Sequence, residues 1–323
     1  MKNAFFLLLL GILVLFCGSE NDIVLQNSVV IMADSAMAAQ VVSSEDDYTR
    51  YLGAYDLSVA KTDNSQPTLD TFLIHLATHV KEWSAEEKAK FRNFAQTAET
   101  QLAPLKLSLP DEIIIIKTSS YEYGGITAAY TRQNAIMITE KFLSASDEKL
   151  YELFLHEIFH IYSRLNPEEK EALYKIIGFY QATDISLPDE WYDRRISNPD
   201  APAMNTYIDL EIDGDTATYA PVFYTRDMTY DPSKPGGIFQ SAVFRLMKVE
   251  GNDDLHVPVY ENGMPVLVQA GSLENFWKKV GRNTTYIIHP EEIMASNFVH
   301  MVVGRDSLPN PEIIEAMRKV ITE

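Results

Sequence analysis

The sequence predicts an α+β fold, because segments that favour helices and segments that favour strands are grouped along the chain rather than alternating. A β-branched run at 111–117 predicts a buried strand, and 126–131 and 135–139 predict two more strands close behind it. Helical patterns precede these strands at 68–103 and follow them at 150–164. We therefore expect a small mixed sheet packed against helices.

Capping residues support the two helical patterns. Ser84 and Glu87 have the spacing of a capping box, in which each side chain binds the backbone N–H of the other residue. Ser144 or Ser146 can cap the helix that contains 150–164, a stretch without glycine or proline. This later helix is the best supported element of the sequence.

The remaining segments carry weaker patterns. Residues 20–66 are expected to be a weakly structured lead-in with one helix, because short apolar stretches alternate with polar residues. Strands are expected at 206–212 and 216–224, a helix at 239–249, a hairpin within 257–268, and helices at 273–280, at 290–302 and from 311 onwards.

The first residues predict export. Lys2 precedes an apolar run at 4–16, which is shorter than the roughly 20 residues of a membrane span and fits the 7–15 of a signal peptide. Cys17 stands where a bacterial lipoprotein carries its lipidated cysteine, although Phe16 replaces the usual small residue. Cleavage near Ser19 without lipidation is the alternative.

The predicted organisation has three parts. They are a signal peptide at 1–19, a helical N-terminal region at 20–104 and a mixed domain at 105–323. The expected location is the periplasm, the outer membrane through a lipid anchor, or the exterior. Contact with a membrane is expected only through lipid on Cys17.

Charge and cysteine content restrict the partners. The chain has 27 basic and 46 acidic residues, a net charge of −19, so that it repels phosphate backbones, and we expect no nucleic-acid partner. Cys17 is the only cysteine, which excludes an intramolecular disulfide and a cysteine-rich metal site. Any metal site must therefore use His, Asp and Glu.

The segment 156–160 reads His-Glu-Ile-Phe-His and lies inside the best supported helix. His156 and His160 are one turn apart on the same face, so both imidazoles can bind one zinc ion. Glu157 lies about 100° around the helix, beside the ion, where it can take a proton from zinc-bound water. Apolar neighbours such as Phe154 and Ile161 make these polar groups costly to bury without a partner.

A catalytic zinc site needs a third protein ligand and an open position for water. Pro290 can open a helix whose first turn holds two acids, and Glu292 is the strongest candidate. Glu291 and His289 remain alternatives. The two acids point in different directions on a helix, so at most one faces the zinc.

These motifs resemble the gluzincin superfamily of zinc peptidases, in which a glutamate on a second helix follows the HExxH motif. Glu292 to Ser296 is similar to the superfamily pattern Glu-x-x-Ala-Asp, with Ser296 at the position of the aspartate. That aspartate binds a zinc-ligand histidine, and Ser296 or Asn297 would replace it here. The resemblance implies a zincin-like catalytic domain with an HExxH active-site helix, and a peptide or protein substrate.

The resemblance also implies a substrate-binding edge strand before the motif helix, for which 127–130 is the candidate. Tyr286 and His289 are candidate donors to the oxyanion of the tetrahedral intermediate. His75 and His79 share the i, i+4 spacing but have no acid between them, and we interpret them as ordinary helix residues.

The functional prediction is an exported zinc peptidase with Glu157 as the general base. One alternative is an exported protein that binds zinc without catalysis. The other is a structural or adhesion lipoprotein in which the HExxH motif is accidental.

Overall fold

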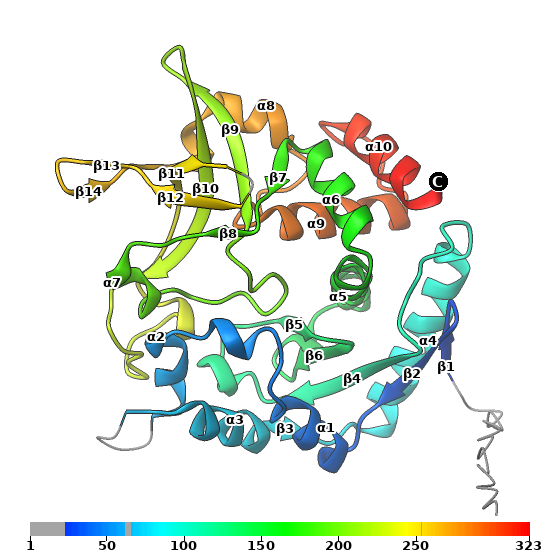
Figure 1. Cartoon of the computed structure of the whole chain (residues 1–323). Helices are drawn as coiled ribbons and strands as arrows, with labels where there is room; N and C mark the ends of the chain where they lie inside the picture. Colours follow the sequence, from blue (N-terminus) through cyan, green and yellow to red (C-terminus); the bar gives the residue numbers. More distant parts are fainter. Residues whose placement is uncertain (1–22, 62–65, 253) are drawn as a thin grey trace, which may run out of the picture.

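The computed structural model describes residues 23–61, 66–252 and 254–323 (Figure 1). The predicted signal peptide at 1–19, with Lys2 and Cys17, therefore lies outside the described residues. Within the described part the fold is α+β, as predicted from the sequence, with helices packed around two larger sheets. No helix in that part is long and apolar enough to span a membrane.

The first sheet has the strand order β1-β2-β4-β6-β5, with β3 also paired to β4. Strands β2, β4 and β6 are parallel to one another, whereas β5 runs antiparallel to β6. Strand β5 is thus an antiparallel edge strand, and α5 packs next to it. The strands of this sheet are β1 (Ile23–Leu25), β2 (Ser28–Met32), β3 (Val80–Lys81), β4 (Glu112–Thr118), β5 (Ala129–Arg132) and β6 (Ala135–Thr139).

The second sheet is largely antiparallel, with the order β7-β9-β10-β11-β12-β8 and with β15 also paired to β11. A separate small hairpin joins β13 to β14. The strands are β7 (Phe179–Gln181), β8 (Asp184–Ile185), β9 (Thr206–Ile212), β10 (Asp215–Thr225), β11 (Ala242–Gly251), β12 (Leu255–Pro258), β13 (Tyr260–Glu261), β14 (Met264–Pro265) and β15 (Leu267–Val268).

Helices lie beside both sheets (Figure 1). The α-helices are α1 (Ser35–Val42), α2 (Ala54–Leu57), α3 (Leu69–Thr78), α4 (Ala85–Leu102), α5 (Asp147–Leu165), α6 (Pro167–Ile176), α7 (Asp189–Tyr192), α8 (Glu274–Val280), α9 (Pro290–Val303) and α10 (Pro311–Thr322). The 3₁₀ helices are η1 (Thr49–Tyr51), η2 (Ser58–Ala60), η3 (Tyr121–Tyr123), η4 (Phe142–Ser144), η5 (Gly237–Phe239) and η6 (Ala270–Ser272).

Most predicted elements are present, and the capping residues act as expected. Ser84 and Glu87 form the capping box of α4. Ser146, not Ser144, caps α5 by accepting from the Lys149 N–H at 3.4 Å. Two acids in the first turn and no internal glycine or proline favour this helix further.

Two local predictions are wrong. The described residues 23–61 of the lead-in predicted at 20–66 are well structured, because β1 and β2 join the first sheet and β2 pairs with β4. One sheet thus joins the predicted N-terminal region to the domain that follows it. The expected helix at 239–249 is strand β11, which pairs with the long strand β10. Val243, Leu246 and Met247 have a helical spacing, but sheet pairing overrides it.

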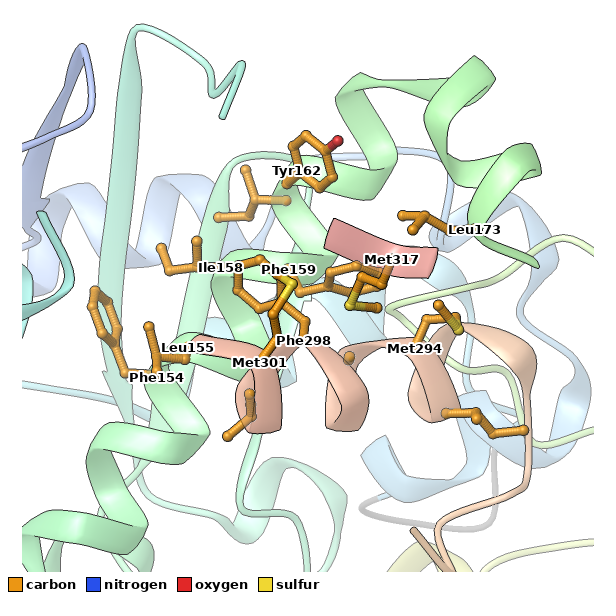
Figure 2. Close-up of a cluster of buried hydrophobic side chains, with 14 of the residues drawn as sticks. Phe154, Leu155, Ile158, Phe159, Tyr162, Leu173, Met294, Phe298, Met301 and Met317 are labelled. Carbon is orange, nitrogen blue, oxygen red and sulfur yellow. The ribbon is translucent and has the colours of Figure 1, made fainter. Parts of the chain in front are cut away.

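The core that holds the site lies between α5 and α9 (Figure 2). Phe159 of α5 and Phe298 of α9 are fully buried, and their ring centroids lie 5.4 Å apart. Met294 and Met301 extend this apolar contact along α9, and Met317 of α10 closes it from outside. The packing fixes the two helices side by side, so that polar residues on their other faces can meet.

We expect Phe298→Ala to lower the free energy of unfolding by about 3–5 kcal/mol, because it leaves a cavity in this contact. Denaturant unfolding measures the change. Ile74→Ala is the control, since Ile74 is 64% exposed and its loss is worth no more than about 0.5 kcal/mol. Equal effects of the two substitutions would contradict the assigned core.

A second prediction concerns Asp56, which is fully buried and accepts hydrogen bonds from the N–H groups of Gly53 and Ser197. Burial raises the pKa of Asp56 from 3.8 to about 6, although those bonds oppose the rise. The folded protein therefore holds this proton more tightly than the unfolded chain, and the associated stability is lost as the pH rises from about 4 to above 6. The loss is on the order of 3 kcal/mol.

Unfolding measurements across this pH range compare the wild-type protein with the variant Asp56→Asn, whose side-chain amide cannot titrate. The wild-type protein should lose stability more steeply with rising pH than the variant does. Parallel pH profiles would show that Asp56 is not the responsible group.

Candidate metal centre

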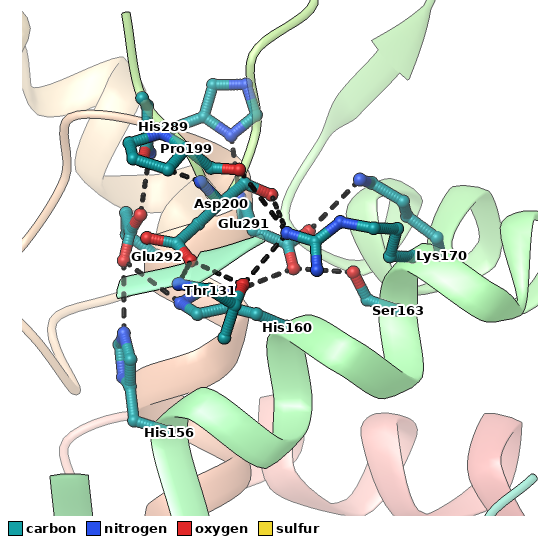
Figure 3. Close-up of polar contacts among 12 residues, drawn as sticks. Thr131, His156, His160, Ser163, Lys170, Pro199, Asp200, His289, Glu291 and Glu292 are labelled. Carbon is teal, nitrogen blue, oxygen red and sulfur yellow. Dashed lines mark hydrogen bonds and ion pairs between the residues drawn. The ribbon is translucent and has the colours of Figure 1, made fainter. Parts of the chain in front are cut away.

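Three side chains from helices α5 and α9 converge on one another (Figure 3). His156 and His160 lie on one face of α5, and Glu292 lies in the first turn of α9. Glu292 Oε2 is 3.1 Å from His156 Nε2 and 3.5 Å from His160 Nε2. The three possible ligand atoms all lie within 4.8 Å of one another. The structure thus brings together the three residues that the sequence predicts as metal ligands.

These residues suit a divalent metal in their chemistry as well as their geometry. Two imidazoles and one carboxylate are a donor set that zinc accepts, with a fourth position left for water. His160 Nε2 is buried without a hydrogen-bond partner in the described part of the chain. Leaving a buried polar atom unpaired is costly, and a bound cation would remove the cost.

Glu291 is directed at the other nitrogen of His160, with Glu291 Oε1 at 2.9 Å from Nδ1. Glu291 is fully buried, and it also accepts from Ser163 Oγ and from the Tyr174 hydroxyl. Lys170 Nζ lies 3.4 Å from its other oxygen. Burial raises the pKa of Glu291, but Lys170 and the hydrogen bonds outweigh burial and hold the pKa below its usual value.

An ionised Glu291 fixes the proton of His160 on Nδ1 and leaves Nε2 available for a metal. The sequence predicts this role of binding and orienting a ligand histidine for Ser296 or Asn297, and that prediction is wrong. Ser296 Oγ donates to the Glu292 carbonyl at 2.9 Å, and Asn297 Nδ2 donates to the Ile293 carbonyl. Both side chains are thus engaged within their own helix.

The segment between α7 and β9 contributes two polar residues that the sequence analysis did not identify. Asn198 Nδ2 donates to Glu292 Oε1 at 2.7 Å, which leaves Glu292 Oε2 directed at the histidines. Asp200 Oδ1 accepts from the N–H of Thr131 at 2.7 Å and from Thr131 Oγ1 at 2.6 Å. The segment is rich in proline and aspartate and has no periodicity, so no local signal distinguished these two residues.

Glu157 lies beside the three convergent residues, and only 2% of it is exposed. Its Oε2 has no hydrogen-bond partner in the described part of the chain, and the residue lines a cleft. Burial first, and then the charge of Asp200, raise the pKa of Glu157 well above its usual value. A carboxylate with raised proton affinity that faces a cleft is suited to accepting and returning a proton.

The cleft has a volume of about 780 Å³ and lies between the first sheet and helices α5 and α9. Residues 126–129 form one wall, which includes the first residue of the edge strand β5. Tyr286 lies in the opposite wall, with its ring stacked near His156 at a centroid distance of 6.3 Å. The structure therefore places Tyr286 in the cleft beside His156, and its role as a donor remains a prediction.

His289 is not part of this cleft wall. It caps α9, since its Nδ1 accepts from the Glu291 N–H at 3.1 Å and its Nε2 lies 3.3 Å from Thr206 Oγ1. Both ring nitrogens are therefore engaged in holding the start of α9. This arrangement corrects the prediction of His289 as an oxyanion donor and removes it as a third metal ligand.

The other histidine pair behaves as an ordinary structural feature. His75 Nε2 lies 3.2 Å from the Glu122 carbonyl, and His79 Nδ1 lies 2.8 Å from Ser119 Oγ.

Comparisons of the chain with protein-family models, curated proteins and solved structures give no match.

We expect Glu291→Gln to weaken zinc binding by about 10–100-fold, because an amide no longer fixes His160 in the metal-binding tautomer. Competition with a fluorescent zinc chelator measures the affinity. Glu86→Gln is the matched control, since Glu86 also lies in the first turn of a helix but is exposed. Unchanged affinity in Glu291→Gln would show that Glu291 does not support the metal centre.

Proposed function

We propose that this protein is a zinc-dependent peptidase with His156, His160 and Glu292 as the metal ligands. The observation that carries the proposal is the convergence of His156 Nε2, His160 Nε2 and Glu292 Oε2 beside a cleft that His156 and Glu292 line. Glu157 lines the same cleft, and its Oε2 has no hydrogen-bond partner among the described residues. Structural zinc sites are usually closed by four protein ligands, whereas three ligands beside a cleft leave a position for water.

A bound zinc ion would lower the pKa of a water molecule and polarise the scissile carbonyl. Glu157 accepts the proton of the attacking water and later delivers it to the leaving amine, since its side chain lines the cleft beside the proposed ligands. Tyr286 donates its hydroxyl proton in a hydrogen bond to the developing oxyanion. Burial and the charge of Glu292 raise the pKa of Tyr286 well above its usual value, so the hydroxyl keeps its proton.

The edge strand β5 binds the substrate backbone in this proposal. Ala128 accepts from the Thr139 N–H and so faces β6, whereas Thr131 directs its N–H away from β6 to Asp200. Successive residues of a strand alternate, so Ala129 faces the same way as Thr131 and presents its backbone groups to the cleft. A peptide can therefore add to the sheet at Ala129.

The proposed fold type is zincin-like, with the gluzincin arrangement of an HExxH helix and a glutamate on a second helix. Support comes from α5 packing beside an antiparallel edge strand of a mixed sheet, and from Glu292 on α9. The proposed exported location rests on the apolar N-terminal stretch of the sequence.

The test is Glu157→Gln. We expect about one equivalent of zinc in both the wild-type protein and the variant, because Glu157 is not a ligand. We expect hydrolysis of a denatured protein substrate to fall by about 10²–10⁴-fold, because the amide cannot take the proton. Metal analysis and peptide mass spectrometry measure the two quantities. A zinc chelator should abolish the wild-type activity, and added zinc should restore it.

Glu168→Gln serves as the control, since Glu168 is exposed in the first turn of α6 and should leave both quantities unchanged. Wild-type protein without bound zinc would contradict the metal centre. Bound zinc with no hydrolysis that depends on Glu157 would instead favour a zinc-binding protein without catalysis.

A further inference from the structure

We infer that the cleft accepts the free amino terminus of a peptide and that Asp200 binds its α-ammonium group. The inference rests on the proposed peptidase function and specifies which peptides are cleaved. An enzyme of this kind removes residues from the N-terminus and leaves internal bonds intact.

The cleft extends from the proposed metal centre in one direction only. On α5 it is lined by residues between Lys149 and Glu157, all on the N-terminal side of His160. On the opposite wall it is lined by 126–129, and the following residues of β5 do not line it. The metal centre therefore lies at one end of the cleft.

The segment that contains Asn198 and Asp200 closes this end. Asp200 binds the N–H of Thr131, so the edge strand cannot pair with a peptide beyond Ala129. Arg164 holds the segment from behind, with its guanidinium donating to Thr131 Oγ1 at 2.8 Å and to the Pro199 carbonyl at 3.3 Å. Only the first residue of a substrate can therefore pair with the edge strand on this side of the metal centre. A longer extension there would have no backbone partner.

A second set of contacts anchors the same segment to the N-terminal part of the chain. The buried Asp56 accepts from the Ser197 N–H at 3.2 Å, and Ser197 Oγ donates to the Tyr51 carbonyl at 2.7 Å. The closure is therefore tied to α2 and η1 on one side and to β5 on the other.

The charges at the two ends of the cleft decide which terminus of a peptide is bound. Glu157, Asp200 and Glu292 are carboxylates at the closed end, whereas Lys149 and Arg282 line the open part together with Glu152, whose charge is paired with Arg305. With a zinc ion of charge +2 bound there, the three carboxylates still leave the closed end negative, so a terminal ammonium is favoured at this end over a terminal carboxylate. The nearby cation, Arg164, already donates to the chain itself and does not line the cleft.

Asp200 is the carboxylate best placed to bind the ammonium. Glu292 faces the two histidines, and Glu157 is assigned to proton transfer. The hydrogen bonds from Thr131 go to Asp200 Oδ1 alone, which leaves Oδ2 for a ligand. A carboxylate oxygen of Asp200 lies within 4.8 Å of a ring nitrogen of His160, close to the position where the first residue of a substrate would be cleaved.

The experiment compares two forms of one peptide mixture, obtained by digesting a denatured protein whose lysines have been blocked. One half keeps free amino termini, and the other half is acetylated at the terminus. We expect the wild-type protein to remove N-terminal residues from the free peptides and to leave the acetylated peptides intact. Mass spectrometry of the products shows which bonds are cut, and no variant is needed for this comparison.

Asp200→Asn then tests the assigned residue. The asparagine keeps an oxygen for Thr131 but loses the charge, so we expect the KM for free peptides to rise by about 10–100-fold with unchanged zinc content. Asp306→Asn, which alters an exposed aspartate after α9, should behave like the wild type.

Two results would overturn the inference and leave the peptidase proposal standing. One is cleavage of internal bonds at equal rates in both peptide mixtures. The other is faster hydrolysis by Asp200→Asn, which would assign Asp200 as an inhibitory fourth metal ligand. Absence of any cleavage that depends on Glu157 in either mixture would instead refute the peptidase proposal, and the inference with it.

Discussion

The arrangement of the site depends on the burial of two adjacent carboxylates against two imidazoles. Glu291 and Glu292 open α9 inside the protein, where isolated charges are strongly disfavoured. Each finds its partners on or next to α5: Glu291 binds Nδ1 of His160, and Glu292 lies against both Nε2 atoms. The apolar contact of Phe159 with Phe298 brings the helices close enough for this pairing. Packing and electrostatics therefore fix the same relative position of α5 and α9.

The parts of the site that could be predicted from the sequence are those with local rules. The spacing of His156 and His160 places them on one helix face regardless of the rest of the fold. Pro290 indicated a helix start with two acids in its first turn, and the similarity of 292–296 to the pattern Glu-x-x-Ala-Asp favoured Glu292. The role of Glu291 was missed because it depends on side chains from α5 and α6, which are distant in sequence.

The failures have one physical cause, which is that pairing between distant segments is not encoded locally. The spacing of Val243, Leu246 and Met247 suits a helix, yet β10 offers a long partner strand and the segment extends as β11. Residues 23–32 have little pattern of their own but gain order beside β4. The same cause explains why Asn198 and Asp200 were not predicted, since only the fold brings them next to Glu292 and Thr131.

At the closed end of the cleft, the contacts that stabilise the fold also limit how a peptide could bind in the proposed substrate site. Asp200 satisfies a backbone N–H of β5 that would otherwise lack a partner at the sheet edge, and the same bond prevents further strand addition there. The neighbouring Asn198 directs Glu292 towards the histidines. A single irregular segment thus protects an edge strand, orients a proposed metal ligand and limits the length of the proposed substrate site. Because the contacts of Ser197 anchor that segment to the N-terminal part of the chain, the strands and helices before 104 contribute to the geometry of the site.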